Sequence, residues 1–358
     1  MRIVQVVESS ATGTLSMVRM IANHFAGQGH DVHVIYSIRA DTPAAIQTLF
    51  DRQVVLHHVQ MTLGRAIVST VTLRRLLTRL RPDVVHLHSS LAGFLGRIAA
   101  VAALPHATFV YSPHCISFMR QDLSFARRNL FIALERLASL RRCRYLACSE
   151  SERRAIHTCL GQPVDIIENA IGPVAAFGPR GRRGTTARCE IVTVGGIRPQ
   201  KDPMLFAAIA RRAAPARLRF TWVGDGDAAL RQVLIEAGVR VTGWIAPAAV
   251  AMHLADADIY LSTSAWEGMP VSILEAMSHA LPVVATRCAG NVDVVDAPCT
   301  GVLFDDADAA TAALGQLAND PAARARLGDA ARVAVRTRFN DTRFFRQLQR
   351  FYDCRGSS

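Results

Sequence analysis

The chain has 358 residues, of which 50% are hydrophobic and 20% charged, and this composition excludes a disordered or fibrous protein. Its length is typical of two domains rather than one hydrophobic core. The net charge is +12, and residues 1–170 carry 19 Arg against 11 acidic residues, whereas residues 191–339 carry 14 basic and 15 acidic residues. The basic first half favours an anionic partner, which could be nucleic acid, anionic lipid or a phosphorylated substrate. An arginine-rich proteome without a specific partner is the alternative explanation.

Hydropathy and cysteine spacing exclude several further classes. The most apolar stretch, residues 91–111, is interrupted by Arg97 and His106, so it does not provide the ~20 apolar residues of a membrane span. The first residues reach an acid at Glu8 without the apolar core and cleavage site of a secretory signal. The eight cysteines are scattered without a CxxC pair, which is typical of reduced thiols and argues against a zinc site. We therefore expect a cytoplasmic protein.

Strand and helix patterns alternate through the first half of the chain. An apolar run at residues 3–7 is followed by a turn containing Gly13, and then by apolar residues at helical spacing up to Phe25. A second strand follows at residues 31–36. Further strands are predicted at residues 83–88, 108–112, 144–149 and 165–169. This β-α-β order, with nearly continuous apolar strands, indicates a parallel sheet covered by helices on both faces.

Residues 172–189 are dense in Gly, Pro and Arg, and we expect a linker there. After it the alternation restarts with strands at 190–194, 219–223, 239–242, 258–264, 282–286 and 301–304. We therefore predict an α/β protein with two doubly wound, Rossmann-like domains, residues 1–171 and 190–339, which face each other across a cleft. The terminal segment, residues 340–358, is expected to form a helix that packs back on the first domain.

Lys201 is the one lysine among the 41 basic residues. A chain that uses Arg at every other basic position has kept an ammonium group here, and the two cations are not interchangeable at a phosphate site. Chance could also produce a single lysine.

The stretch from Ser262 to Met277 is the most informative in the sequence. It predicts a strand, a loop carrying Glu267 and Gly268, and a helix with Pro270 at its first position and Glu275 further along. The N–H groups and positive dipole end of such a helix bind anions. The two carboxylates could accept hydrogen bonds from sugar hydroxyls. An ordinary loop acid and an ordinary helix glutamate are the alternative.

Glu267 begins the motif Glu-Gly-Met-Pro, and Glu275, eight residues later, begins Glu-Ala-Met. Two glutamates at this spacing and in these motifs resemble the pattern of glycosyltransferase family 4, which comprises retaining enzymes of the GT-B fold. The resemblance covers nearly the whole chain in order. Its other matching segments are Asp83–His88, Ser112–His114, Ile167–Ala170, Val194–Pro203, Trp222–Gly226 and Val241–Gly243.

This resemblance implies roles for residues of the second domain, which would bind the donor, a nucleotide diphosphate sugar. Lys201 would hold the diphosphate and neutralise the leaving group, and Glu275 would bind the ribose hydroxyls. Glu267 would hold sugar hydroxyls and phosphate together with Gly268, Met269 and Pro270. The remaining implied donor contacts are Arg198, Gly224 and Gly243, the last of which would border the base.

Two residues of the first domain also receive roles from the resemblance. His114, at a strand end, would face the transferring sugar, and Gly13 would let the backbone approach the reaction centre. Taken alone, a histidine such as His114 is more often a structural histidine. Lys201, Glu267 and His114 are thus the residues that we expect to carry catalysis.

The sequence departs from the family pattern at Gly196, where the family usually has Arg. Either Arg198 takes over the phosphate contact, or Lys201 is left as the one cation and donor binding is weaker. A decayed donor site would follow in the extreme case.

No metal or other cofactor is expected. Two Asp-x-Asp pairs, Asp256 with Asp258 and Asp306 with Asp308, could hold Mg²⁺. The first pair precedes a predicted buried strand and the second begins a helix, where acidic residues act as caps.

The resulting hypothesis is retaining transfer of a hexose or N-acetylhexosamine, with UDP as the expected nucleotide, to a polyprenyl-diphosphate-linked or surface-polysaccharide glycan. Lipopolysaccharide and exopolysaccharide are such products. Residues 118–144 interleave apolar and Arg residues, and we expect this basic amphipathic helix to lie on the inner face of the anionic cytoplasmic membrane. An ordinary half-buried helix is the alternative. Nucleic acid is not expected, because aromatic residues are only 6%. Two other functions stay open: nucleotide-sugar epimerisation on the same fold, and a non-catalytic basic binder.

Overall fold

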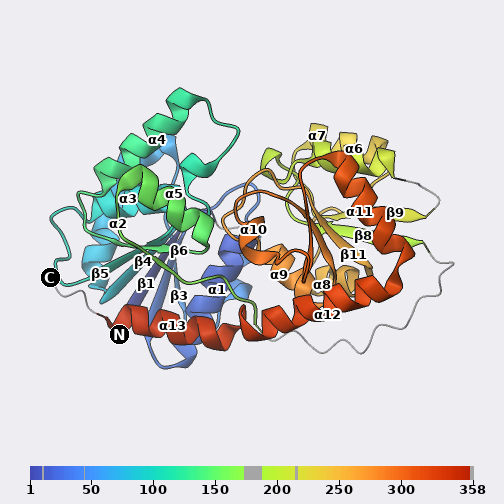
Figure 1. Cartoon of the computed structure of the whole chain (residues 1–358). Coiled ribbons are helices and arrows are strands. Elements are labelled where there is room, and N and C mark those ends of the chain that lie inside the picture. The colour runs from blue at the N-terminus through green and yellow to red at the C-terminus, as the bar shows by residue number, and fades with distance from the viewer. Residues whose placement is uncertain (10–11, 44, 173–187, 214–216, 355–358) are drawn as a thin grey trace. The chain divides into compact units, whose positions relative to one another are not determined.

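The computed structural model describes residues 1–9, 12–43, 45–172, 188–213 and 217–354 (Figure 1). The chain divides into unit 1, Met1–Asn169 with Thr342–Ser358, and unit 2, Ala170–Asp341. Of the predicted linker, residues 173–187 lie outside the described residues. Its last residue, Cys189, is already part of a strand and is buried, because the apolar run of that strand begins there.

Unit 1 is built on a seven-stranded parallel sheet in the order β3-β2-β1-β4-β5-β6-β7. β1 lies inside the sheet, and its residues Ile3 to Val7 are fully buried because helices cover both faces. The strands are β1 (Arg2–Val7), β2 (Asp31–Tyr36), β3 (Val55–His58), β4 (Val84–His88), β5 (Thr108–Ser112), β6 (Arg144–Ala147) and β7 (Val164–Ile166).

Helices α2 to α5 cover one face of this sheet and α1 and α13 cover the other (Figure 1). The core under α2 to α5 contains Leu73, Leu95, Ile132 and Ile156. The helices are α1 (Thr12–Gly27), α2 (Ala66–Leu80), α3 (Ser90–Ala99), α4 (Phe125–Ala138), α5 (Glu150–Leu160) and α13 (Asp341–Asp353), with short 3-10 turns η1 (Ile46–Leu49), η2 (Leu63–Arg65) and η3 (Ser117–Met119).

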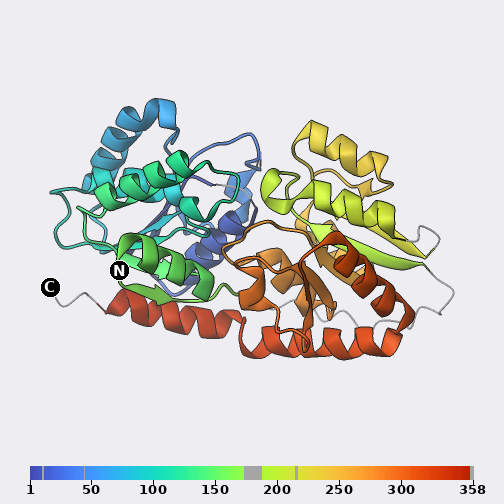
Figure 2. The ribbon, with the colours of Figure 1, turned by 45° about the horizontal axis from the view of Figure 1, so that its top comes forward.

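Helix α13 belongs to unit 1 although it is the last element of the chain (Figure 2). Its apolar face is buried through Phe344, Leu348 and Tyr352. Phe345 stacks on His24 of α1, with ring centroids 3.5 Å apart. This confirms the prediction that the terminal segment packs back on the first part of the chain.

Unit 2 has a six-stranded parallel sheet in the order β10-β9-β8-β11-β12-β13. The strands are β8 (Cys189–Val194), β9 (Leu218–Val223), β10 (Arg240–Val241), β11 (Ile259–Ser262), β12 (Val283–Thr286) and β13 (Gly301–Phe304). Its core is centred on Phe206, Trp222 and Leu314, and the Phe206 ring meets Trp222 edge-on. The prediction of two parallel, Rossmann-like α/β sheets is confirmed.

The helices of unit 2 also form two layers, with α6, α7 and α11 on one face and α8, α9 and α12 on the other (Figure 1). They are α6 (Pro203–Arg212), α7 (Ala228–Glu236), α8 (Pro247–Asp256), α9 (Val271–Ser278), α10 (Asn291–Val294), α11 (Ala307–Asn319) and α12 (Pro321–Thr337), together with the 3-10 turn η4 (Pro199–Lys201).

Two predictions about helices were wrong in detail. Residues 118–144 do not form one amphipathic helix, because η3 and a turn at residues 121–122 precede α4, which begins after the Ser124 cap and ends at Ala138. Gly13 lies in the first turn of α1 rather than in the turn before it. Among the described residues, no helix has the length and apolar character needed to cross a membrane.

Candidate active site

Hydrogen bonds to β9 and to the loop that follows it hold the loop after β8 in place. Ile197 donates its N–H to the Asp225 carbonyl at 2.8 Å, and the buried Trp222 donates its Nε1–H to the Gly195 carbonyl at 2.8 Å. The backbones approach so closely that a Cβ on Gly224, whose φ is +141°, would lie 2.2 Å from the Gly195 oxygen. The two glycine-containing loops therefore fix the start of the segment that carries Lys201.

Lys201 ends the short turn η4 and is anchored from both sides. Thr263 donates its hydroxyl to the Lys201 carbonyl at 2.8 Å. The next residue, Asp202, is left-handed at φ 44° and caps α6 by accepting the Leu205 N–H at 3.0 Å. The lysine stem therefore leaves a rigid backbone at the carboxyl end of β8, the edge at which parallel α/β sheets bind ligands.

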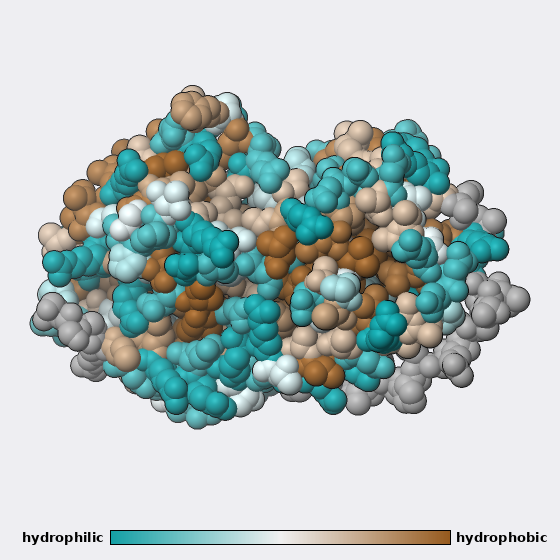
Figure 3. Space-filling view, viewed as in Figure 1, coloured by the Kyte–Doolittle hydropathy of each residue, from teal (hydrophilic) through white to brown (hydrophobic). Residues whose placement is uncertain are grey.

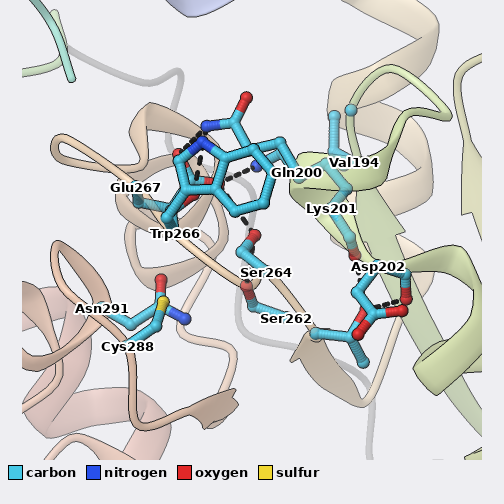
Figure 4. Close-up of polar contacts among 12 residues, drawn as sticks. Val194, Gln200, Lys201, Asp202, Ser262, Ser264, Trp266, Glu267, Cys288 and Asn291 are labelled. Carbon is cyan, nitrogen blue, oxygen red and sulfur yellow. Dashed lines mark hydrogen bonds and ion pairs between the residues drawn. The ribbon is translucent and has the colours of Figure 1, made fainter. Parts of the chain in front are cut away.

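The Lys201 ammonium forms a nearly buried ion pair with Glu267. Nζ lies 2.7 Å from Oε1, and the side chains are 12% and 9% exposed (Figure 4). Ser264 donates its hydroxyl to the same oxygen at 2.8 Å, and Gln200 donates its Nε2–H to Oε2 at 3.1 Å. Burial is the largest single influence on the pKa of Lys201 and lowers it, but Glu267 and Tyr260 together outweigh burial, so the pKa is raised and the amine stays charged.

Glu267 is thus buried, and the alternative explanation of it as an ordinary loop acid at the surface is wrong. Its backbone N–H donates to Ala289 at 3.0 Å, which places the Glu267 loop directly against Gly290. A Cβ on Gly290, whose φ is +84°, would lie 2.6 Å from the Glu267 Cβ. A glycine is therefore required at position 290 for Glu267 to reach Lys201.

The predicted helix start after Glu267 needs correction. Pro270 is extended, with ψ 104°, and precedes the first helical residue Val271 instead of occupying the first position of α9. Gly268, Met269 and Pro270 are buried. Glu275 is the fifth residue of α9 and is half-buried.

Gly224 and Gly243 are brought together after β9 and β10. They form an isolated antiparallel bridge, and Gly224 donates its N–H to the Thr242 hydroxyl at 3.2 Å. Gly243 is left-handed at φ +74°, and a Cβ there would lie 3.6 Å from a carboxylate oxygen of Asp225. The two predicted donor-contact glycines therefore line one loop cluster beside the Lys201 segment.

Arg198 lies beside the position at which the family pattern has its arginine. Its Nε is 3.9 Å from where a Cβ on Gly196 would sit, and it is buried without a hydrogen-bond partner. The Arg198 charge also lowers the Lys201 pKa, so the two cations are neighbours. The Gly196 φ is not in the left-handed region, and the nearest neighbour of a Cβ there would be Trp244 Cη2 at 3.5 Å. A Cβ is thus sterically acceptable at position 196.

The unit 1 candidate His114 follows β5 in a strained conformation, with φ 54°. Glu152 of α5 stabilises this loop, because its Oε1 accepts the N–H groups of Cys115 at 2.6 Å and Ile116 at 3.0 Å. His114 Nε2 lies 2.9 Å from Nδ1 of His88. Burial lowers the pKa of His114 to about 4, so its imidazole is neutral at pH 7.

Sequence reasoning missed the residues that support these groups. Gln200 and Ser264 lie within segments that the sequence singled out but received no role, and Glu152 lies outside all of them. Each acts through a contact with a residue that its own segment does not reveal. His88 had a signal, because it ends the His-Leu-His strand that carried part of the resemblance.

The second pair supplies the predicted helix cap, whereas Asp258 of the first pair binds the backbone of strand β8. Asp306 accepts the Ala309 N–H at 2.8 Å at the start of α11, and Asp258 accepts the Glu190 N–H at 2.9 Å. Within the part of the chain that the structure describes, no three His, Cys, Asp or Glu side chains are grouped to hold a metal ion.

Two Rossmann-like units, one with a buried lysine–glutamate pair at the carboxyl end of its sheet, are consistent with a glycosyltransferase of the GT-B type. Sequence comparison agrees. The family model "Glycosyltransferase Family 4" matches residues 12–173, and "Glycosyl transferases group 1" matches residues 188–320. The chain belongs to glycosyltransferase family 4 and is an enzyme of that class.

Two relatives of the chain have a nucleotide sugar in their names. It is 31% identical to a GDP-mannose-dependent alpha-mannosyltransferase of Mycolicibacterium smegmatis, over 94% of this chain and 93% of the relative. It is 27% identical, over 70% of both chains, to the Escherichia coli UDP-Gal:alpha-D-GlcNAc-diphosphoundecaprenol alpha-1,3-galactosyltransferase. The solved structure of Anabaena Alr3699/HepE with UDP-glucose shares the fold, with a TM-score of 0.78 at 18% identity over 99% of each chain.

Proposed function

We propose that this glycosyltransferase moves a hexose or N-acetylhexosamine from a UDP-sugar, with retention of the anomeric configuration, to a glycan carried on polyprenyl diphosphate. The Escherichia coli relative, whose name specifies UDP-Gal and a diphosphoundecaprenol acceptor, supports the donor and the acceptor class. Retention is what the family resemblance implies.

The observation that carries this proposal is the buried Lys201 ammonium. Departure of UDP develops negative charge on the diphosphate, and a fixed cation in a water-poor site stabilises that charge in the transition state. Lys201 meets this requirement because its stem is nearly buried and its backbone is anchored by Thr263. Arg198 would supply the second cation in place of the arginine that Gly196 lacks.

Glu267 acts mainly on Lys201 in this proposal. Its Oε1 already accepts from Lys201 and Ser264, and its Oε2 accepts from Gln200, so one acceptor position on Oε2 is left for a sugar hydroxyl. Glu267 therefore keeps the ammonium charged and aimed while contributing at most one contact to the sugar. Glu275 would bind the ribose hydroxyls from α9.

The acceptor proposal is also supported by the outer face of α4. Phe125, Leu130 and Leu137 are exposed, Phe125 to 80%. Glu135, the one acid of α4, is buried and paired with Arg97, so the charges left on the exposed side of the helix are arginines. Hydrophobic and hydrophilic side chains alternate on the surface over this part of unit 1 (Figure 3). We propose that this face rests on anionic lipid, where a polyprenyl-linked acceptor is found.

A donor screen tests the proposed reaction. Full-length protein is incubated with UDP- and GDP-sugars, with and without a lipid-linked GlcNAc-diphosphate acceptor, and nucleotide release and sugar products are measured. We expect acceptor-dependent release of UDP. Sugar interconversion without acceptor would instead identify an epimerase, and absence of both UDP and GDP binding by calorimetry would identify a decayed binder. Gly196→Arg is expected to be at least as active as the natural chain.

Co-sedimentation with vesicles tests the membrane surface. Replacing both Leu130 and Leu137 with Ser should reduce binding to vesicles containing anionic lipid at least about tenfold, since each side chain contributes roughly 1.5–3 kcal/mol when fully buried. Val333→Ser, an exposed apolar position on α12 of unit 2, is the control and should bind as the natural chain does. Equal binding of the double variant and the natural chain would contradict the proposal.

A further inference from the structure

A continuous chain of buried hydrogen bonds links the C-terminal helix of unit 1 to the His114 loop. Tyr352 of α13 has its hydroxyl 2.7 Å from His86 Nδ1 and 3.2 Å from Gln5 Nε2. Gln5 Oε1 lies 2.6 Å from His88 Nε2, and His88 Nδ1 lies 2.9 Å from His114 Nε2. The first four residues of this chain are at most 1% exposed. Solvent therefore does not compete for these contacts.

The contacts have a fixed direction because each neutral imidazole carries one proton. Burial lowers the pKa of His86, His88 and His114, so all three are neutral at pH 7. Gln5 donates from Nε2 to Tyr352, which leaves its Oε1 to accept the Nε2–H of His88. His88 Nδ1 is then an acceptor, so His114 must donate from Nε2. His114 Nδ1 consequently carries a lone pair.

Among the residues that the structure describes, none is a partner for that lone pair. His114 Nδ1 is buried and makes no hydrogen bond, although a buried imidazole nitrogen normally has one. The loop cannot easily turn to satisfy it, because Glu152 holds the adjacent N–H groups of Cys115 and Ile116. The site is therefore built around an acceptor that lacks its donor.

We propose that Gln5 and His88 are positioning residues that hold His114 in the tautomer with an unprotonated Nδ1, which accepts a hydrogen bond from a hydroxyl group of the substrate. The hydroxyl as ligand rests on the proposed sugar transfer, whereas the tautomer does not. A lone pair repels the anionic oxygens of a diphosphate, so His114 contributes to binding the neutral sugar rather than the leaving group. It also has no proton on Nδ1 to donate to that group.

Nitrogen NMR of the imidazoles tests this without any activity measurement. The full chain is labelled with ¹⁵N-histidine, long-range proton–nitrogen correlations are recorded at pH 7.5, and the His114 signals are assigned with His114→Gln. We expect His114 to be the pure Nε2–H tautomer in the natural chain. In Gln5→Leu, which removes the acceptor of His88, we expect His114 to show both tautomers. Gln60→Leu, which changes a glutamine of unit 1 outside this chain of contacts, should leave the signals unchanged.

Two results would overturn the proposal. An Nδ1–H tautomer in the natural chain would mean that the Gln5 amide faces the other way and that every contact in the chain is reversed. A single unchanged tautomer in folded Gln5→Leu would remove the positioning role of Gln5. If Gln5→Leu does not fold, the NMR spectrum of the natural chain is sufficient to determine the tautomer of His114. If the natural chain shows the expected tautomer but transfers no sugar, the proposed function is contradicted. The inference about the tautomer still stands in that case.

Discussion

At the scale of single residues, the site depends on backbone positions as much as on charges. Lys201 is held by a turn, a threonine hydroxyl and a carboxylate, and the carboxylate reaches it because Gly290 leaves room. The sequence predicted Lys201 and Glu267 as site residues, since a single lysine and an acid before a helix carry their own signal. It could not predict that they pair, because 66 positions separate them.

Gly290→Ala tests this dependence. The new methyl group would meet Glu267 at 2.6 Å in a backbone conformation that disfavours alanine, so the Glu267 loop must move away from Lys201. We expect a loss of sugar transfer of about a hundredfold, the scale that a small misplacement of a catalytic group produces. Gly315→Ala is the matched control, because its Cβ would meet nothing within 4 Å inside α11. Its activity should be unchanged, and equal activities of the two variants would refute the packing argument.

At the scale of elements, unit 2 begins four of its helices with an aspartate. Asp202, Asp227, Asp306 and Asp320 each accept a backbone N–H in the first turn of their helix. The sequence predicted the Asp306 cap from its position before a helical pattern.

The sequence analysis missed β3 in unit 1, because Val55–His58 is a short edge strand whose residues are only partly buried and carry little apolar signal.

Asp306→Ala should lower the free energy of unfolding of unit 2 by about 1 kcal/mol, the usual cost of losing such a cap. Asp308→Ala is the control, because Asp308 is 86% exposed and its contact with Arg212 is at the surface. The comparison is made by denaturant unfolding followed by tryptophan fluorescence. A strong fall of activity in both variants at full stability would instead point to a metal-binding carboxylate pair.

At the scale of the whole molecule, the features discussed above are distributed over two structural units. Unit 1 contains the histidine chain and the arginine-rich α4, and unit 2 contains the lysine–glutamate site. All three tryptophans, Trp222, Trp244 and Trp266, lie in unit 2. Tryptophan fluorescence therefore follows the unfolding of unit 2, whereas unit 1 must be followed by hydrogen exchange.

The buried histidines make unit 1 sensitive to acid. Burial lowers the pKa of His114 to about 4, below the 6.5 of an unfolded histidine, so the unfolded chain binds more protons between these values. The contribution of His114 is therefore complete above pH 6.5 and falls by about 3 kcal/mol as the pH drops to 4. Comparison with His114→Gln isolates it, because opposing groups such as Glu152 are present in both proteins. An equal loss of stability in the two proteins between pH 7 and 4 would show that His114 is not buried as a neutral imidazole.

The proposed reaction depends on the Lys201 ammonium to stabilise the departing nucleotide diphosphate, and turnover of the double variant Lys201→Met with Glu267→Gln tests this role most directly. Removing both charges avoids leaving a buried carboxylate unpaired, so we do not expect the double variant to lose the stability that an unpaired buried charge would cost. We predict acceptor-dependent sugar transfer at least about a hundredfold slower than in the natural chain, the cost of losing one preorganised electrostatic contact. Transfer at an undiminished rate, in a variant with the tryptophan fluorescence of the native fold, would contradict it.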